Sequence, residues 1–399
     1  MSSEFRNQGS EAGPGRFVSR RIAAVPPSGI RKFFDLLSTI DDVISLGVGE
    51  PDYVTPAPIR QAAIASIEAG HTHYTSNYGL IELRERLAEH LQRLYGVSYD
   101  PRTELIITSG ASEALDVTFR AILDPGDELL CADPSYVAYM PATLMAGGCF
   151  RPVPTYAEND FRLLAGDVEA AITPRTRAIL LGYPSNPTGA VMGREDLLAI
   201  GEVAARHDLA VISDELYDRM TYGLAHTCFA SLPGMHGRTV LLGGFSKTYA
   251  MTGWRLGWVA APAPLAEAVM KVHQYVMMSA PTAAQYAGLA ALEHGESFVQ
   301  EMVAEYDRRR RLMVDGFRAI GLPTFEPRGA FYAFPDVSGT GLSSTEFSER
   351  LLSEERVAVV PGNAFGAGGE GYVRACYASS YEQIERALER IGRFVQRAG

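Results

Sequence analysis

The sequence is poor in the features that mark secreted, membrane-spanning and nucleic-acid-binding proteins. Its four cysteines are widely spaced and form no CxxC pair, which is typical of unpaired thiols in a reducing compartment. Residues 1–16 are polar and lack the apolar core of a signal peptide, and no apolar run is long enough to span a bilayer. The net charge of −11 argues against a nucleic-acid-binding surface. We therefore expect a cytoplasmic protein with a flexible terminus at residues 1–16, which binds neither a membrane nor a nucleic acid.

Glycines and metal ligands are missing where two common kinds of site need them. The segment SGASEA, at residues 109–114, follows a strand-like run but holds one glycine, whereas the dinucleotide fingerprint GxGxxG needs three. The glycine-rich GAGGEG, at residues 366–371, leads into a strand-like run and is expected to be a loop. His71 and His73 alternate as strand neighbours would, but no third metal ligand is apparent. The sequence therefore disfavours a dinucleotide oxidoreductase and predicts no metal site.

The pattern of short runs indicates an α/β protein with two domains. The chain has 399 residues, of which 47% are hydrophobic and 21% charged, as in globular proteins with a sizeable core. In its middle, β-rich runs alternate with helical periodicity, for example residues 104–110 and then 111–123, which predicts a mostly parallel, buried sheet. The tail differs, with a long amphipathic helix at 296–320, two strand-like runs and a last helix at 380–396. It predicts a smaller α+β domain, against which we expect the first fifty residues to pack.

Two groups of side chains are given ordinary structural roles. The basic run at residues 308–311 is expected to fan around a helix and to lie in water beside Glu305 and Asp307. Met277 and Met278 could line a substrate pocket, but methionine more often fills a core, so we expect core positions for both.

The stretch GGFSKTYAMTGWRLGW, at residues 243–258, sets two cations among apolar and small residues. Lys247 is either a surface lysine on a loop or an amine held away from water, where desolvation lowers its pKa and makes it a nucleophile. Arg255, eight residues later, is a permanent cation suited to a phosphate or a carboxylate. Other segments decide between these interpretations.

Three strand ends supply polar groups that could surround the same ligand. Residues 109–114 join a strand to a helix whose first N–H groups can hold an anion, or they form a plain turn. Asn186 lies between two prolines, in a loop that fixes its direction. Asp214 ends a strand in VISDELYD and could cap the next helix, but ligands bind at the carboxyl ends of strands in open α/β sheets. With Lys247 and Arg255, this set would complement pyridoxal phosphate, a phosphorylated pyridine with an aldehyde and a phenolic oxygen.

In this combination the sequence resembles the class I aminotransferases of the fold-type I pyridoxal-phosphate enzymes, over nearly the whole chain. It is particularly similar to the prokaryotic aspartate and aromatic amino-acid aminotransferases. The matching segments are ISLGVGEPD, HYTSNYGLIELRE, SGASEA, NPTGAV, ISDELYD, FSKTYAMTGWRLG and GYVRACYASS. The resemblance implies a large domain with a seven-stranded, mostly parallel sheet at residues 56–295. It also implies a small α+β domain from residues 17–55 and 296–399, with the site between the two.

The resemblance gives roles to the groups around the cofactor ring. Lys247 would join the cofactor's aldehyde and later carry the proton between substrate and cofactor. Asp214 would pair with the pyridinium N–H and keep the ring protonated. Asn186 and Tyr217 would hydrogen-bond the phenolic oxygen, and the ring of Tyr136 would stack on the cofactor.

The same resemblance implies how the phosphate is held. Arg255 and the backbone N–H groups of Ala111 and Ser112, which follow Gly110, would bind it, and Tyr74 would reach the phosphate of a neighbouring subunit. That match implies a homodimer with shared active sites.

One position departs from the family pattern. The family often has a phosphate-binding serine three residues before the lysine, where this chain has Gly244. Ser246 is the candidate to replace it. At the substrate end, Arg374 would grip the α-carboxylate beside the backbone of Gly49, with Asn186 nearby.

We therefore predict a ping-pong transaminase that moves the amino group of an L-amino acid to 2-oxoglutarate. Aromatic amino acids are favoured over aspartate, whose distal carboxylate needs a second cation, for which Arg20, Arg21 and Arg31 are candidates. A β-lyase or decarboxylase of the same fold is the main alternative. A non-catalytic sensor is disfavoured, because such sensors carry a DNA-binding extension, for which we see no room before Phe17.

Overall fold

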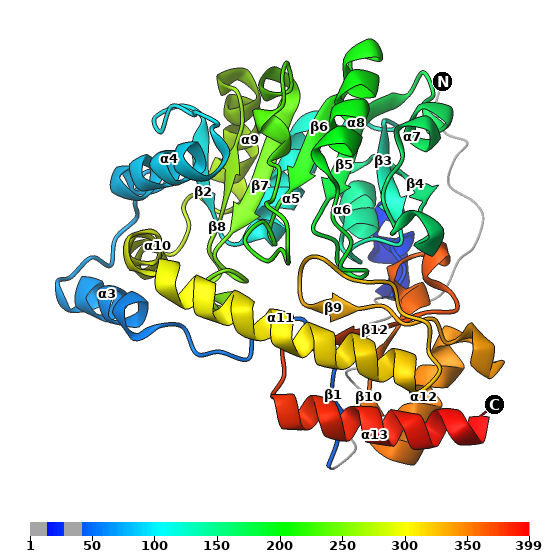
Figure 1. Ribbon diagram of the computed structural model, residues 1–399. Coiled ribbons are helices and arrows are strands. Elements are labelled where there is room, and N and C mark those ends of the chain that lie inside the picture. Colours follow the sequence, from blue (N-terminus) through cyan, green and yellow to red (C-terminus); the bar gives the residue numbers. More distant parts are fainter. Residues whose placement is uncertain (1–13, 28–41, 399) are drawn as a thin grey trace.

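The computed structural model describes residues 14–27 and 42–398, and it is built around a seven-stranded sheet (Figure 1). β8 runs antiparallel to both of its neighbours and the other pairs are parallel, so the predicted mostly parallel sheet is confirmed. Most of the terminus that we predict to be flexible, residues 1–13, lies outside the described residues. In spatial order the strands are β2 (Leu105–Thr108), β8 (Gly257–Ala260), β7 (Thr239–Gly244), β6 (Ala210–Asp214), β5 (Thr176–Gly182), β3 (Glu128–Asp133) and β4 (Cys149–Pro154).

Helices cover both faces of this sheet, which explains why its central strands are continuous apolar runs. Successive strand residues point to opposite faces. Leu180 and Ile212 therefore pack with α5 (Ala111–Ile122), α6 (Tyr139–Ala146) and α9 (Ala263–Val276). Ile179 and Val211 pack on the other face with α7 (Ala165–Ala171) and α8 (Arg194–Arg206). Over β2, β7 and β8 that other face is covered by α3 (Ala57–Glu68), α4 (Ile81–Tyr95) and α10 (Thr282–His294).

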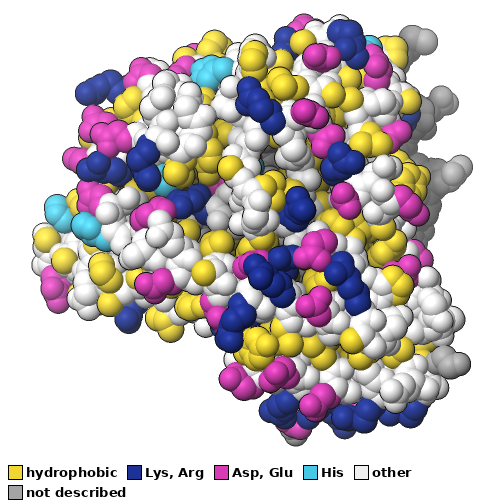
Figure 2. Space-filling view, in the orientation of Figure 1, with side chains coloured by type: hydrophobic (Ala, Val, Ile, Leu, Met, Phe, Trp, Pro, Cys, Tyr) yellow, Lys and Arg dark blue, Asp and Glu magenta, His cyan; other side chains and the backbone are white. Residues whose placement is uncertain are grey.

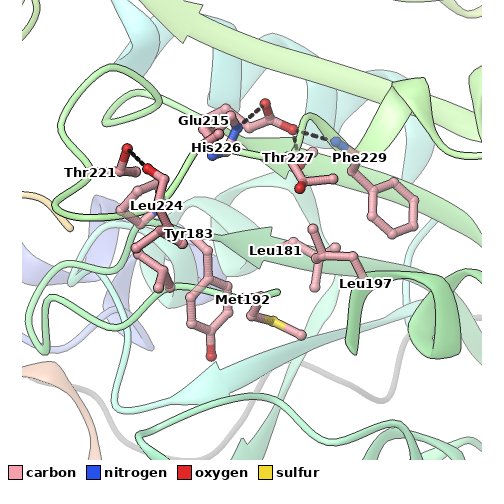
Figure 3. Close-up of a pocket in the computed structure, with 14 residues that line it drawn as sticks. Leu181, Tyr183, Met192, Leu197, Glu215, Thr221, Leu224, His226, Thr227 and Phe229 are labelled. Atoms are coloured by element: carbon pink, nitrogen blue, oxygen red, sulfur yellow. Dashed lines mark hydrogen bonds and ion pairs between the residues drawn. The ribbon is translucent and has the colours of Figure 1, made fainter. Parts of the chain in front are cut away.

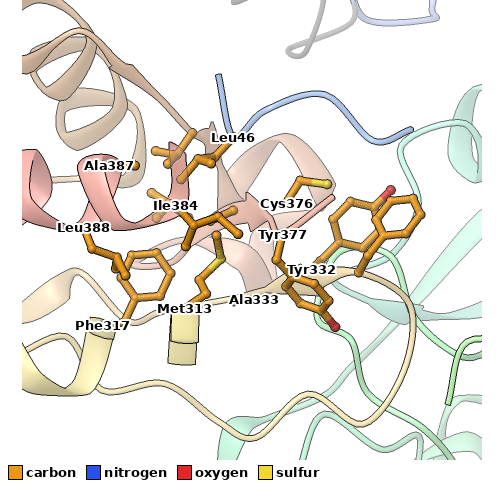
Figure 4. Packing of buried hydrophobic residues seen from close by; sticks show 14 of the residues in the cluster. Leu46, Met313, Phe317, Tyr332, Ala333, Cys376, Tyr377, Ile384, Ala387 and Leu388 are labelled. Carbon is orange, nitrogen blue, oxygen red and sulfur yellow. The ribbon is translucent and has the colours of Figure 1, made fainter. Parts of the chain in front are cut away.

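The two ends of the chain meet in a second apolar core, below the sheet in Figure 1 and enlarged in Figure 4. Leu46 from the N-terminal segment packs there with Met313, Tyr332, Cys376 and Ile384. β1 pairs in parallel with β10, and β12 pairs with β9 and β11. The predicted packing of the first fifty residues against the tail is thus seen from residue 44 onward, while the domain boundaries themselves stay a prediction. The elements of this part are β1 (Ile44–Ser45), α11 (Glu296–Ala319), β9 (Tyr332–Ala333), α12 (Ser344–Glu355), β10 (Val357–Ala358), β11 (Val360–Pro361), β12 (Val373–Cys376) and α13 (Tyr381–Ala398).

Short elements complete the described chain. One is the exposed helix α1 (Arg20–Ala23). Among the described residues, no helix is long and apolar enough to cross a bilayer. The four cysteines are free thiols, and of these Cys149 alone is exposed. The 3-10 helices are Pro14–Phe17, Ala157–Asn159, Phe229–Ser231, His236–Arg238, Thr252–Trp254, Ser338–Thr340, Gly362–Phe365 and Ala367–Gly369.

The basic run at residues 308–311 fans around α11 as expected, but only half of it lies in water. Arg308 and Arg311 are exposed and pair with Glu305 and Asp307, the neighbours that the sequence predicts. The expectation is wrong for Arg309 and Arg310, which are each 8% exposed, because Asp52 and Glu305 pair with the first and Asp307 and Glu326 with the second. Figure 2 shows basic and acidic side chains interspersed on this face.

The methionines expected in the core are at the surface instead. Met277 and Met278 are 41% and 44% exposed, and the neighbouring Tyr275 is 87% exposed. They follow the end of α9, where the backbone N–H groups of both methionines bond back to the carbonyl oxygen of His273 and turn the chain outward.

Candidate active site

A cavity of about 290 Å³ lies at the carboxyl ends of the central strands. Residues of both cores line it, from Gly182 and Asp214 at the ends of β5 and β6 to Arg374 on β12. Nine of the predicted site residues contribute to this lining: Gly49, Ala111, Ser112, Tyr136, Asn186, Asp214, Tyr217, Lys247 and Arg374. Four do not line it within this chain: Gly110, Ser246, Arg255 and Tyr74.

Lys247 follows the end of β7 and is held away from water. Its Nζ donates a hydrogen bond to the carbonyl oxygen of Gly49 at 2.6 Å. Burial lowers the pKa of Lys247 to about 8, with Arg374 and Arg255 acting in the same direction and Cys376 and Glu50 opposing them. The amine can therefore lose its charge near neutral pH, as the sequence predicts.

Asp214 is buried at the end of β6. Burial raises the pKa of its carboxyl to about 6, although two hydrogen bonds counteract that shift. The hydroxyl of Tyr139 donates to Oδ2 at 2.8 Å, and the N–H of Leu216 donates to Oδ1 at 3.2 Å. Tyr139 is a site residue that the sequence reading missed, and its one signal is its place three residues after Tyr136. The two rings pack edge to face.

The substrate end is built around Arg374, which is 3% exposed. Its Nη1 donates to Asn186 Oδ1 at 2.9 Å and its Nη2 donates to the carbonyl oxygen of Gly47 at 2.7 Å. The guanidinium packs against the rings of Tyr332 and Phe365, with its central carbon 4.5 and 4.8 Å from their centres. Within the described residues its buried Nε has no hydrogen-bond partner. The bonds to Asn186 and Gly47 use only two of the five guanidinium N–H groups.

Tyr332 is the second residue that the sequence reading missed. Its hydroxyl lies 2.8 Å from the hydroxyl of Tyr217, and both tyrosines are buried. A Cβ at Gly49 would lie 2.5 Å from that same Tyr332 oxygen. Glycine at position 49 therefore lets the backbone that holds Lys247 pass close to this pair.

The predicted phosphate end is a tight turn at the start of α5. Gly110 has φ +80°, which favours glycine, and it precedes the helix without a side-chain cap, so the first N–H groups of α5 remain available. A Cβ at Gly110 would lie 2.7 Å from Arg255 Nη2, and a Cβ at Gly257 would lie 2.6 Å from the Ala111 nitrogen. Arg255 thus lies against the turn, whereas Ser246 is buried beside the cavity without lining it.

Tyr74 lies apart from this cavity and is 80% exposed, in a surface hollow that it lines together with Met277. Its predicted contact with a neighbouring subunit therefore stays a prediction. His71, which the sequence reading weighed as a metal ligand, stacks on Tyr286 with the ring centres 4.9 Å apart.

A smaller cavity of about 20 Å³ lies on the opposite face of β5 and β6 (Figure 3). Glu215 points into it, because it follows Asp214 and alternate residues face opposite sides. Its Oε1 accepts hydrogen bonds from the Ser213 hydroxyl and the Phe229 N–H, and its Oε2 lies 2.6 Å from His226 Nε2. Although burial lowers the pKa of His226, Glu215 raises it overall. These bonds pin the segment that carries Asp214.

Comparison with known proteins identifies the family. Residues 41–391 match the family model for aminotransferases of class I and II.

The chain belongs to the class I and II aminotransferases.

Among its relatives, an aspartate aminotransferase of Pyrococcus abyssi is 47% identical, over 94% of this chain and 97% of that protein. The aromatic-amino-acid aminotransferase 2 of Thermococcus litoralis is 46% identical, with the same coverage of both chains. The crystal structure of an aromatic aminotransferase from Pyrococcus horikoshii matches with a TM-score of 0.88 at 47% identity, over 92% of this chain and 99% of that chain. This chain is therefore a transaminase.

Class I aminotransferases generally depend on pyridoxal phosphate, and the residues of this aminotransferase fit that group. Arg255 and the free N–H groups of α5 suit a phosphate, and the buried carboxyl of Asp214 suits a ring N–H. The amine of Lys247 suits the aldehyde.

Proposed function

We propose that this aminotransferase moves the amino group of an L-amino acid to 2-oxoglutarate by a ping-pong mechanism, with pyridoxal phosphate as cofactor. One observation carries the proposal: a buried amine with a pKa of about 8 lines the same cavity as the buried guanidinium of Arg374. Such an amine can accept a proton from a substrate carbon, and the guanidinium can hold the carboxylate on that carbon. Both groups act on an α-amino acid at the same place.

Each residue around the cavity has one task in this mechanism. When bound, pyridoxal phosphate supplies an electron sink for the negative charge that develops on the substrate Cα. Lys247 Nζ takes the Cα proton and returns it, and the Gly49 carbonyl beside it orients the amine. Asp214 holds the proton of the ring nitrogen, while Asn186 and Tyr217 donate to the phenolic oxygen.

The remaining residues bind rather than transfer protons. Tyr136 stacks on the ring, and the N–H groups of Ala111 and Ser112, exposed by the turn at Gly110, hold the phosphate together with Arg255. Ser246 is the remaining candidate for the phosphate site, although its side chain does not line the cavity. Asn186 is held ready by its bond to Arg374, which grips the α-carboxylate.

The lining of the cavity favours aromatic substrates, with aspartate as the alternative. Lys247 and Arg374 are the cations among the described lining residues, so no second guanidinium faces a distal carboxylate from this part of the chain. Arg20 and Arg21 lie on the exposed helix α1, and Arg31 lies outside the described residues. The relatives include proteins named for each substrate class.

We further propose a cytoplasmic homodimer with shared active sites, in which Tyr74 completes the neighbour's phosphate site. The support is that Tyr74, Tyr275 and the two methionines after α9 are exposed, and that Tyr74 and Met277 line the same surface hollow. Each subunit has a large domain at residues 56–295 and a small domain from residues 17–55 and 296–399, with the cavity between their cores.

Glutamate formation from phenylalanine and 2-oxoglutarate tests this function. The wild-type protein with pyridoxal phosphate should form glutamate, and Lys247→Ala should bind the cofactor but turn over negligibly. Substantial transamination by that variant would refute the role of Lys247. Release of pyruvate and ammonia from a β-substituted amino acid such as serine, without an acceptor acid, would instead identify a β-lyase. A higher kcat/KM for aspartate than for phenylalanine and tyrosine would refute the substrate order.

A further inference from the structure

A buried acid–histidine pair lies directly behind the phosphate-binding turn. His273 on α9 is 0% exposed, and its Nδ1 is 2.6 Å from Oε1 of Glu113, which is 9% exposed. Glu113 is the third residue of α5, so it immediately follows Ala111 and Ser112, which line the cavity. The pair therefore belongs to the helix end that faces the phosphate, although it does not line the cavity itself.

Both members of the pair are tied to backbone on their far sides. The Oε2 atom of Glu113 accepts a hydrogen bond from the N–H of Ser109, the residue before the turn glycine. On the other side, His273 Nε2 lies 2.9 Å from the carbonyl oxygen of Asn77. One chain of contacts thus joins Asn77, α9 and the two residues on either side of the turn.

The partners of the imidazole decide how many protons the pair holds. A carbonyl oxygen only accepts, so Nε2 carries a hydrogen that it donates to Asn77. Nδ1 then either donates to an ionised Glu113 or accepts from a protonated one. In both cases the pair has two protons and no net charge.

That neutrality matters at this end of the helix. A carboxylate in the first turn competes with a bound phosphate for the same free N–H groups, and it repels the phosphate charge at short range in a medium of low dielectric constant. An uncompensated Glu113 would act in both ways. With His273 in place, its carboxyl is turned back onto the Ser109 N–H and its charge is balanced.

We infer that His273 is a positioning residue for the phosphate-binding turn, because it neutralises Glu113 and holds its carboxyl away from the phosphate. This inference rests on the proposed binding of pyridoxal phosphate. It assigns a role in cofactor binding to a histidine that touches neither cofactor nor substrate. A purely structural histidine would stabilise the contact between α9 and α5, and its loss would affect the binding of ligands with and without a phosphate equally.

The test compares pyridoxal phosphate with pyridoxal, which lacks the phosphate, by equilibrium titration of the cofactor-free protein. His273→Gln should weaken the binding of pyridoxal phosphate about tenfold and that of pyridoxal less than about threefold, because the uncompensated carboxylate acts on the phosphate alone. Adding Glu113→Gln to that variant should restore most of the lost affinity, because the offending charge is gone. His90→Gln is the matched control, since His90 is also buried but lies on α4 and should leave both affinities unchanged.

Equal losses for the two ligands, or no recovery in the double variant, would overturn the inference in favour of a structural role. If His273→Gln does not fold, Glu113→Gln alone tests the same contact. It removes the charge that His273 balances but keeps an oxygen that can accept from the Ser109 N–H, so the affinity for pyridoxal phosphate should stay within about threefold of the wild type. A loss of about tenfold or more for both ligands would again overturn the inference. A wild-type protein that binds no pyridoxal phosphate would refute the proposed function first, and that result differs from every outcome above.

Discussion

The hydrogen bond from Tyr139 to Asp214 makes a quantitative prediction about cofactor binding. Tyr139→Phe removes a hydroxyl that lies 2.8 Å from Asp214 Oδ2 and stabilises its ionised form. A hydrogen bond to a charged group contributes about 1.5 to 3 kcal/mol, which corresponds to about one to two pKa units. The pKa of Asp214, about 6 in the wild type, should therefore rise to between about 7 and 8 in the variant.

The consequence appears in the pH dependence of cofactor affinity, because only the ionised carboxyl accepts the ring N–H. The ratio of the variant's Kd for pyridoxal phosphate to that of the wild type should be near one at pH 9, where both carboxyls are ionised. At pH 6 the ratio should reach about 5 to 50, since half of the wild-type carboxyls but few of the variant's are ionised. Titrations of the cofactor and of Lys247 are common to both proteins and largely cancel in the ratio.

The assay is an equilibrium titration of cofactor-free protein, followed by the quenching of tryptophan fluorescence between pH 6 and pH 9. Tyr183→Phe is the matched control, because that buried hydroxyl bonds to the Phe161 carbonyl oxygen and lines the smaller cavity. A Kd ratio for Tyr139→Phe that stays constant across this range, or that falls toward pH 6, would refute the reasoning.

Three further predictions follow from the site and the segment behind it. Arg374→Lys should lower kcat/KM for phenylalanine about 100-fold with little change in cofactor affinity, because a lysine cannot bind the carboxylate through two parallel N–H groups while it contacts Asn186. Equal losses in both quantities would contradict this. Gly110→Ala should weaken the binding of pyridoxal phosphate about tenfold or more, since φ at this position is +80° and the new Cβ would displace Arg255. An unchanged affinity would show that the turn adapts. Glu215→Gln should lower thermal stability more at pH 6 than at pH 9. Because Glu215 raises the pKa of His226, the ion pair stabilises the fold fully below pH 6.5 and is lost as the pH rises through the pKa of His226 in the folded protein. An equal loss at both pH values would argue against an ionised pair.

The fold and many of the residues that line the cavity could be predicted, because each lies in a short segment with a recognisable pattern. Lys247, Asp214 and Asn186 each follow a strand-like run, so their meeting at one edge of the sheet follows from parallel pairing. Tyr139 and Tyr332 escaped notice because tyrosine is common in cores. Their roles depend on contacts with Asp214 and Tyr217, which lie 75 and 115 residues away.

The errors in surface and core have a related cause. Arg309 is buried because Asp52, 257 residues earlier in the chain, lies beside it, and no local pattern announces such a partner. The exposure of Met277 was not predicted, because hydrophobicity alone does not distinguish a core position from a surface that another chain could cover. Substrate choice is hard to read for the same reason, since it depends on cations whose distance from the cavity is not encoded in any one motif.

The short strand at residues 44–45 affects how the chain folds during synthesis. The residues that follow it hold Lys247 and Arg374 through the carbonyl oxygens of Gly49 and Gly47, whereas the strand itself pairs with Val357–Ala358. During synthesis this segment leaves the ribosome early and must wait for some three hundred further residues before it can pair. A nascent chain can build most of the parallel sheet in that interval. The site that we propose for the substrate carboxylate is therefore completed late in synthesis, and we expect incomplete chains to lack transaminase activity.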